Sequence, residues 1–230
     1  MEKILDEILG GEKKHEYPQD FPLKEFSHNK YMATKQNLDE LRILVNKKAS
    51  EKELHEFIEL NPHLLSFALY TYSTGHHNSW VLSKQVIRPK IQDVDWGLIP
   101  DFIVGGKSSD GFDWWVIELK GANEEIFKYD GRKVYFSDTA NKATFQCLEY
   151  VDYCAEIQDH LRGTFKLKQF REPNGLILMG HESELESHEL KRKMKRAWNR
   201  IHPKKLEIRT YSWLLRNFEM NAWVLDTPDK

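Results

Sequence analysis

Cysteine is scarce in this sequence, which has only Cys147 and Cys154 among 230 residues and no Cys-x-x-Cys pair. Small disulfide-stabilised folds and cysteine-ligated zinc sites are therefore excluded, because both need several cysteines at short spacings. The two cysteines lie two helical turns apart in the sequence. We expect reduced thiols in the hydrophobic core of a cytoplasmic protein.

Long hydrophobic runs are missing as well. No stretch of eighteen apolar residues occurs, so the sequence predicts no membrane-spanning helix. The first residues, Met1 to Gly11, mix Ile and Leu with acidic side chains and end in two glycines. This pattern predicts a short amphipathic helix and lacks the apolar core of a signal peptide.

The motifs of several common enzyme classes are also absent. Gly10-Gly11 and the stretch 105–108 lack the spacing of a nucleotide-binding P-loop, and no Gly-x-Ser-x-Gly nucleophile motif occurs. His76-His77 has no Cys, His or Asp at metal-ligand spacing. The sequence therefore gives no support to a P-loop nucleotide-binding site, a serine hydrolase or a histidine zinc site.

The composition is that of a globular protein, with 40% hydrophobic and 30% charged residues. The formal net charge of -2 excludes a uniformly basic surface but allows a local basic patch. Residues 1–35 are mostly polar and contain Pro18 and Pro22, so we expect an N-terminal arm or linker there. Residues 36–230 are long enough for one domain with one core.

Hydrophobic periodicity predicts alternating helices and strands in this domain. A helix is expected over 37–46, and Ser50 with Glu53 forms a capping box that opens a second helix, which Pro62 ends. Strands are predicted at 80–87, 101–104, 114–120, 175–180 and 206–209, and further helices at 141–161, 184–200 and 211–218. Residues 105–111 are expected to form a hairpin loop. The order predicts an α/β fold in which helices flank both faces of a mixed central sheet.

Three charged residues lie at the ends of two neighbouring predicted strands. Asp101 opens one strand, and Glu118 and Lys120 close the next. Because strand side chains alternate, Glu118 and Lys120 point to one face while Ile117 and Leu119 point into apolar packing. Two carboxylates and a lysine placed in this way can hold a hard divalent cation beside a water, which suits phosphodiester hydrolysis.

Each part of this pattern is weak when it is taken alone. A Glu-x-Lys sequence at a strand end is more often a solvated edge of the sheet. Gln146 and Tyr150 lie one helical turn apart and share a helix face, which by itself is more often a partly exposed surface. The order of the parts, and the short hairpin that joins the two strands, favour a functional site.

Together these parts resemble the PD-(D/E)XK nuclease superfamily, whose pattern is Pro-Asp, then Glu-x-Lys, then a helix with Gln-x-x-x-Tyr. The surrounding sequence is similar to the nuclease domain of Shedu anti-phage defence proteins over roughly residues 36–218. The similar segments are 53–62, 100–104, 115–120, 175–180 and 211–215. Shedu proteins usually carry a larger N-terminal region, and His55 stands where that family often has Gln.

The resemblance implies a restriction-endonuclease-like core and a Mg²⁺-dependent endonuclease, with Mn²⁺ as a substitute. Asp101 and Glu118 would bind the metal, and Lys120 would orient the attacking water or steady the charge on the phosphate. A glutamate of the first core helix would complete the metal shell. Glu53 is the first choice and Glu56 the alternative, although a capping role explains Glu53 equally well.

The resemblance assigns further roles to the second half of the chain. Gln146 and Tyr150 would position the scissile backbone rather than take part in the chemistry. DNA would be the partner, and the protein would be a homo-oligomer without contact to a membrane.

A basic segment supports nucleic-acid binding independently of the resemblance. From Glu189 to Arg209, nine Lys and Arg residues stand against two glutamates, a balance of +7. The candidate phosphate-binding residues are Lys191, Arg192, Lys195, Arg196 and Arg200. A solvated helix face is an equal alternative, but the acidic balance of the rest of the chain makes the asymmetry meaningful.

Two other functions are compatible with the same residues. One is a non-catalytic nucleic-acid-binding module on a nuclease fold, which the intact Asp101, Glu118 and Lys120 disfavour. The other is a nuclease that acts on RNA or in repair, which the sequence does not separate from a DNA nuclease because fold and catalytic residues are shared.

Overall fold

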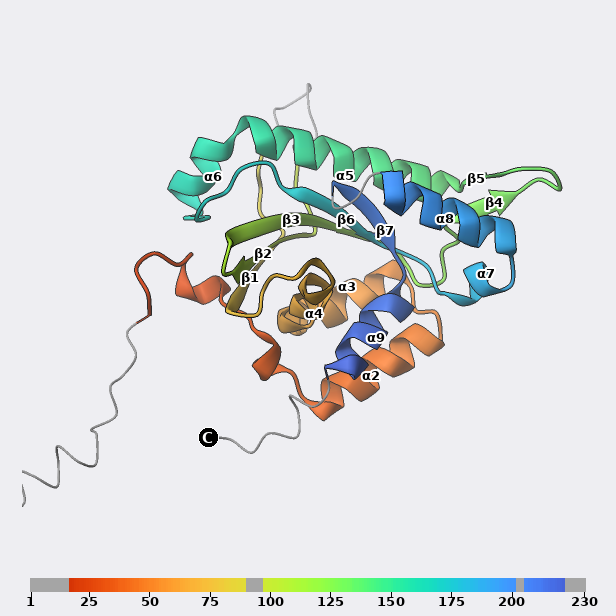
Figure 1. Cartoon of the computed structure of the whole chain (residues 1–230), viewed down its shortest axis with the longest axis horizontal. Coiled ribbons are helices and arrows are strands. Elements are labelled where there is room, and N and C mark those ends of the chain that lie inside the picture. The colour runs from red at the N-terminus through yellow and green to blue at the C-terminus, as the bar shows by residue number, and fades with distance from the viewer. Residues whose placement is uncertain (1–16, 90–96, 202–204, 222–230) are drawn as a thin grey trace, which may run out of the picture.

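The computed structural model describes residues 17–89, 97–201 and 205–221 of the protein. A five-stranded sheet lies at the centre, and helices cover both of its faces (Figure 1). The predicted α/β fold with a mixed sheet flanked by helices is therefore confirmed. The helix predicted at Met1–Gly11 lies outside the described residues.

The strands of the central sheet lie in the order β1-β2-β3-β6-β7. They are β1 (Asn78–Ser83), β2 (Phe102–Ser108), β3 (Gly111–Leu119), β6 (Asn174–Leu178) and β7 (Leu206–Arg209). The first three strands pair antiparallel, whereas β3, β6 and β7 pair parallel. Parallel neighbours need crossover connections, and helices supply them here.

The hairpin between β2 and β3 is tighter than the sequence predicts. Residues 105–108 belong to β2, and Ser108 pairs directly with Gly111, so the turn has two residues. A Cβ on Gly105 would lie 2.4 Å from the Trp114 ring, so glycine allows this ring to pack against the strand. In contrast, β1 ends before the predicted position 87, because Lys84 takes a left-handed backbone conformation with φ 47°.

Helices that follow β3 and β6 in the chain lie on one side of the sheet (Figure 1). They are α5 (Asp138–Glu156), α6 (Gln158–Thr164), α7 (Ser183–Glu186) and α8 (Glu189–Ile201). The helices predicted as continuous over 141–161 and 184–200 are thus each divided in two. Ile157 interrupts the first with φ -98° and ψ 26°. A small hairpin of β4 (Phe127–Tyr129) and β5 (Val134–Phe136), which the sequence analysis missed, precedes α5.

The opposite side of the sheet carries α2 (Lys35–Asn46), α3 (Glu51–Leu60), α4 (Ser66–Leu69) and α9 (Tyr211–Met220) (Figure 1). The 3-10 turns are η1 (Lys24–Phe26), η2 (Lys30–Met32), η3 (Pro62–Leu65) and η4 (Tyr70–Tyr72). The predicted capping box is confirmed, since Ser50 Oγ accepts from Glu53 N and the Glu53 carboxylate accepts from Ser50 N at 2.9 Å. Pro62 ends α3 and begins η3, also as predicted.

Alternating side chains of β3 pack into the two layers of helices. Trp115, Ile117 and Leu119 belong to the cluster shared with α2, α3, α4 and α9. Trp114 and Val116 pack on the other side, against residues of α5 and α6. Glu118 follows Val116 on that second side, so this carboxylate lies at the end of an otherwise apolar row.

The end of β3 is joined to the start of α3 by backbone hydrogen bonds. Ala122 N donates to Ala49 O at 2.9 Å, and Gly180 N donates to Gly121 O at 3.0 Å. A Cβ on Gly121 would lie 2.0 Å from the Asn123 side chain and 3.1 Å from Glu51 N, so glycine favours this close approach. The loop after β3 thereby fixes the position of α3 relative to the strand.

Both cysteines lie on α5, where they are buried and unpaired. Burial raises the pKa of the Cys147 thiol and raises that of Cys154 to about 12. The prediction of reduced core thiols is confirmed. No helix within the described ranges is long and apolar enough to cross a membrane.

Candidate active site

The three charged residues singled out in the sequence meet at one edge of the sheet. Phe102 pairs with Ile117, so Asp101 and Glu118 lie opposite each other at the next position of the two strands. Asp101 Oδ2 accepts a hydrogen bond from Leu119 N at 2.7 Å, which orients the carboxylate against β3. Lys120 Nζ lies 2.7 Å from Glu118 Oε1. The structure therefore brings Asp101, Glu118 and Lys120 together, as predicted.

The charges in this cluster strongly influence one another. The side chain of Glu118 is only 2% exposed. Burial, and next the charge of Asp101, raise its pKa to about 7 despite the nearby lysine. Burial lowers the pKa of Lys120, but the charges of Glu118, Glu51 and Asp101 outweigh this effect and raise it. Negative charge thus exceeds positive charge in a site that is shielded from water.

Helix α3 adds two residues that the sequence analysis did not assign to the site. Glu51 Oε1 lies 3.4 Å from Lys120 Nζ. His55 stacks on Phe102, and its Nε2 lies 3.3 Å from Asp101 Oδ1. Its Nδ1 lies 3.5 Å from Glu59 Oε2. These α3 residues recur every four positions, which is the spacing of one helix face and the signal that would have identified them.

Glu53, the predicted third metal ligand, lies on a different side of α3. Its carboxylate bonds to the backbone and hydroxyl of Ser50 and forms a 2.6 Å ion pair with Lys47. The Lys47 and Ser50 contacts lower the pKa of Glu53 to about 2. Positions 51 and 53 point in different directions on a helix, so Glu53 serves as a cap while Glu51 reaches the cluster. The structure therefore does not bring Glu53 to the strand residues.

Glu56, the alternative choice, is also away from the strand residues. Its carboxylate is exposed and lies 3.9 Å from Lys52 Nζ. Both residues border an open groove of about 480 Å³ whose lining also includes Asp101. The other lining residues are Glu51, His55, Glu59 and Lys84. A predominantly acidic groove would repel a phosphate unless a cation were bound with it.

Gln146 and Tyr150 face the strand ends from α5. Gln146 Nε2 donates to Tyr150 Oη at 2.8 Å, and Tyr150 Oη donates to Ile99 O at 3.1 Å. Tyr150 is buried, and burial raises its pKa to about 12. Because Ile99 lies two residues before Asp101, this chain of hydrogen bonds holds the segment that positions Asp101. Gln146 and Tyr150 thus help to position Asp101 through hydrogen bonds within the protein.

Several buried polar atoms beside this cluster lack a hydrogen-bond partner among the described residues. They are Glu118 Oε2 and Tyr211 Oη, whereas His55 Nε2 makes no hydrogen bond but lies 3.3 Å from Asp101 Oδ1. Burial raises the pKa of Tyr211, and the charges of Asp101, Glu51 and Glu118 raise it further. Buried polar groups are nearly always paired in native proteins, so the unsatisfied atoms indicate a site for a ligand.

The donor set fits a hard divalent cation. Among the described residues, no three His, Cys, Asp or Glu side chains are already grouped as a metal site. Mg²⁺, however, commonly binds one or two protein carboxylates and keeps several waters. Asp101 and the unpaired oxygen of Glu118 supply such a pair, and a bound cation would relieve their mutual repulsion.

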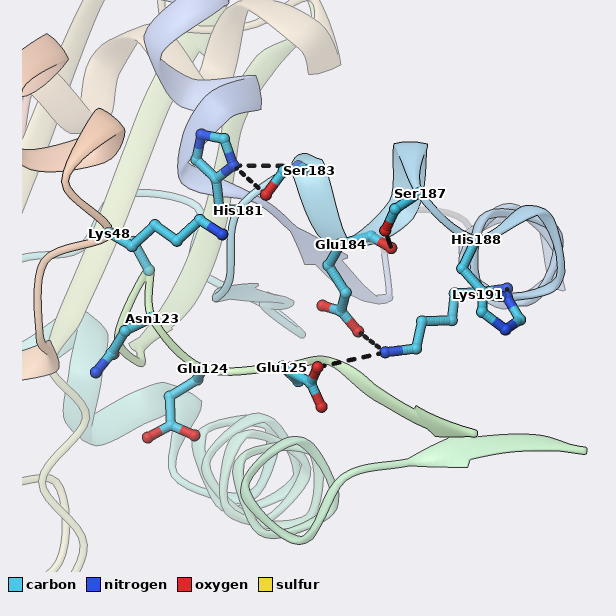
Figure 2. A pocket seen from close by; sticks show the side chains of 11 residues that line it. Lys48, Asn123, Glu124, Glu125, His181, Ser183, Glu184, Ser187, His188 and Lys191 are labelled. Carbon is cyan, nitrogen blue, oxygen red and sulfur yellow. Dashed lines mark hydrogen bonds and ion pairs between the residues drawn. The ribbon is translucent and has the colours of Figure 1, made fainter. Parts of the chain in front are cut away.

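The five basic residues predicted to bind nucleic acid fall into two groups. Lys191 is buried, and its Nζ lies 3.1 Å from Glu184 Oε1 and 3.7 Å from Glu125 Oε1 (Figure 2). The remaining four border a different hollow on another side of α8, namely Arg192, Lys195, Arg196 and Arg200. The structure therefore separates Lys191 from the others, because its charge is already neutralised inside the protein.

The chain can now be compared with known proteins. No curated protein matches it. One family model, described as Shedu protein SduA, C-terminal, matches residues 48–215. This range spans most of the chain and contains the cluster of Asp101, Glu118 and Lys120. The chain thus belongs to the Shedu family, as the sequence resemblance indicates, and this membership implies a role in anti-phage defence.

Proposed function

We propose that this protein is a metal-dependent endonuclease that hydrolyses phosphodiester bonds of DNA as a cytoplasmic effector of anti-phage defence. The observation that carries the proposal is the meeting of Asp101, Glu118 and Lys120 around the unpaired, buried oxygen of Glu118. Membership of the Shedu family supports the defence role.

The proposed chemistry divides among the residues of the cluster. Asp101 and Glu118 would hold Mg²⁺ or Mn²⁺, which supplies an activated water and neutralises charge on the phosphate. Lys120 lies within reach of Glu118 and would present its ammonium to the phosphate oxygens where negative charge accumulates. His55 would keep Asp101 in place from the other side.

Substrate would reach this cluster through the open groove beside α3. The groove exposes Asp101 to solvent, whereas Glu118 is buried behind it. The exposed arginines of α8 would dock the DNA backbone at a distance from the cluster. A homo-oligomer, which light scattering of the purified protein would reveal, would place two such grooves on one DNA.

The test is a cleavage assay on linear and supercoiled DNA with Mg²⁺, Mn²⁺ or EDTA. We expect cleavage with either metal, none with EDTA, and none in an Asp101→Asn variant, which keeps the hydrogen-bond acceptor for Leu119 N. A Glu53→Gln variant is the matched control, because this carboxylate caps α3 and does not join the cluster. Equal cleavage by wild type and Asp101→Asn would overturn the proposal.

Two arms of the assay address the alternatives. An RNA substrate of the same sequence separates a DNA nuclease from a nuclease that acts on RNA. DNA binding by gel shift in the absence of cleavage, with every metal tested, would instead favour a non-catalytic binding module on this fold.

A further inference from the structure

A hollow of about 350 Å³ lies where α7, α8 and the end of β7 meet. Five cationic side chains line it, namely Arg192, Lys195, Arg196, Arg200 and Arg209. The wall also contains Glu182 and Glu186. Arg192, Arg196 and Arg200 recur every four residues and so form one stripe of α8, beside which Lys195 lies.

The positive charge of this hollow is largely uncompensated. Within the described residues, Arg192, Lys195, Arg196 and Arg200 form no ion pair. Glu182 is already bound by Arg216, which leaves it little capacity to neutralise the hollow. Arg209 pairs with Glu207, which also accepts a hydrogen bond from Tyr72.

The surroundings of Lys195 in this hollow disfavour its charged form. Burial, and next the charge of Arg209, lower its pKa to about 8. Lys191, one helical turn earlier, is buried and is held by Glu184 and Glu125, whereas Lys195 is half-buried. Two glutamates from outside α8 therefore neutralise Lys191, whereas at Lys195 the attraction of Glu207 is outweighed by burial and the charge of Arg209. A polyanion in the hollow would supply the missing counter-charge.

The hollow and the candidate active site lie on the same edge of the sheet. Lys120 N donates to Leu178 O, and Met179 N donates to Arg209 O, so the ends of β3, β6 and β7 are aligned. Two strand spacings, or about 10 Å, separate the ends of β3 and β7. In parallel sheets, ligands bind outside the carboxyl ends of the strands.

We propose that this hollow is a phosphate-binding pocket, in which Lys195, Arg200 and Arg209 hold a phosphate group carried by a polynucleotide backbone or by a free nucleotide. Planar guanidinium groups match the geometry of phosphate oxygens, and an ammonium among them adds a compact charge. The proposal requires no step of the proposed hydrolysis, so failure of cleavage would leave it intact.

The test measures phosphate binding by the full chain in the absence of divalent metal. Isothermal titration with inorganic phosphate at pH 7 and constant ionic strength should give a saturable signal. Lys195→Met and Arg200→Gln should each weaken the phosphate affinity by about tenfold or more, since each removes a charge-assisted contact. Lys193→Gln is the matched control on the same helix, because Lys193 is exposed and paired with Glu189.

The Lys195→Met variant has a second readout that a merely structural role would not produce. It should raise the melting temperature of the ligand-free protein while abolishing the further rise that phosphate causes in the wild type. Arg200 is exposed, so Arg200→Gln tests the pocket even if the core of the helix were disturbed by the first variant. Wild-type phosphate affinity in both variants would overturn the proposal.

Competition identifies the source of the phosphate. A mononucleotide and a short oligonucleotide are each titrated against bound inorganic phosphate at equal phosphate concentration. Tighter displacement by the oligonucleotide assigns the pocket to the nucleic-acid backbone, and tighter displacement by the mononucleotide assigns it to a free nucleotide. Displacement by neither ligand would count against the pocket.

Discussion

The acidic cluster at the end of β3 and the basic pocket at the end of β7 are opposite in sign but alike in construction. Each holds an ionisable group beside a group of the same charge, the buried Glu118 beside Asp101 and the half-buried Lys195 beside Arg209. The pKa of Glu118 rises to about 7 and that of Lys195 falls to about 8. Both regions therefore lower the stability of the ligand-free protein, and binding of a ligand of the opposite charge would raise it.

The largest expected effect concerns Lys120, which lies between Glu118 and Glu51. Lys120→Ala should lower the single-turnover cleavage rate by about 10²- to 10³-fold, because its charge is needed where negative charge develops in the transition state. DNA binding should change little, since Lys120 is paired with Glu118 and Glu51 and does not line the groove. Single-turnover kinetics at saturating Mg²⁺ measures the effect, and wild-type rates would remove this lysine from the mechanism.

The next prediction applies the same substitution, Lys to Met, to two lysines of α8. Lys191→Met should destabilise the protein by about 3 kcal/mol, because it leaves Glu184 buried without its cation. Lys195→Met should stabilise it, because burial and the charge of Arg209 outweigh the attraction of Glu207 at Lys195. Urea unfolding of both variants provides the comparison. If both substitutions change the free energy of unfolding in the same direction, the contrast between the two lysines is wrong.

A smaller effect is expected from His55, which touches Asp101 from α3. His55→Ala should weaken Mn²⁺ affinity by about tenfold, a typical cost of losing a side chain that orients a metal ligand. Glu53→Gln on the same helix is the control and should leave the affinity unchanged. Calorimetric titration with Mn²⁺ gives the affinities, and equal values for wild type and His55→Ala would remove His55 from the site.

The basic pocket also predicts a pH dependence of stability. The folded pKa of Lys195, about 8, lies below its ordinary value of 10.5. Between these values the unfolded chain keeps a proton that the folded protein has released, so stability should rise with pH from about 8 to 10.5. Below pH about 8 Lys195 is charged in both states, so the full cost of holding this charge in the folded protein remains. Urea unfolding at several pH values should show this rise in the wild type and a flatter profile in Lys195→Met.

The smallest effect is expected for the exposed arginines of the pocket. Arg192→Gln and Arg196→Gln should each reduce the slope of DNA affinity against salt by about one, because each phosphate contact releases a counterion. Lys191→Gln should leave that slope unchanged, since its charge is used inside the protein. An unchanged slope in the arginine variants would make this stripe a solvated helix face.

The sequence predicted those parts of the site that depend on local periodicity. Strand alternation placed Glu118 and Lys120 on one face, and the hairpin brought Asp101 beside them. The four-residue spacing of Glu51 and His55 shows that they share a face of α3, but tertiary packing decides that this face meets the site. The structure does not bring Glu53 to the cluster, because its carboxylate caps α3.

Tertiary contacts also explain why the sequence did not distinguish the lysines of the basic helix α8. Charge counting treats Lys191 and Lys195 alike, because both lie in one cationic run. The two lysines differ because Glu125 and Glu184 pair with Lys191. Glu125 lies far from α8 in the sequence, and Glu184 lies in α7, just before it. The missed β4-β5 hairpin has only three residues in each strand, too few for a clear alternation.

The tight junction of Gly121 and Ala122 with Ala49 has a consequence for protein engineering. Because backbone hydrogen bonds and a glycine contact set the spacing between α3 and the end of β3, an inserted residue there would move Glu51 and His55 away from Lys120. The hairpin tip at Gly131 has open space around it and would accept an inserted tag or reporter domain. The tolerance of this chain to added length is thus lowest beside its chemistry and highest at the tip of β4 and β5.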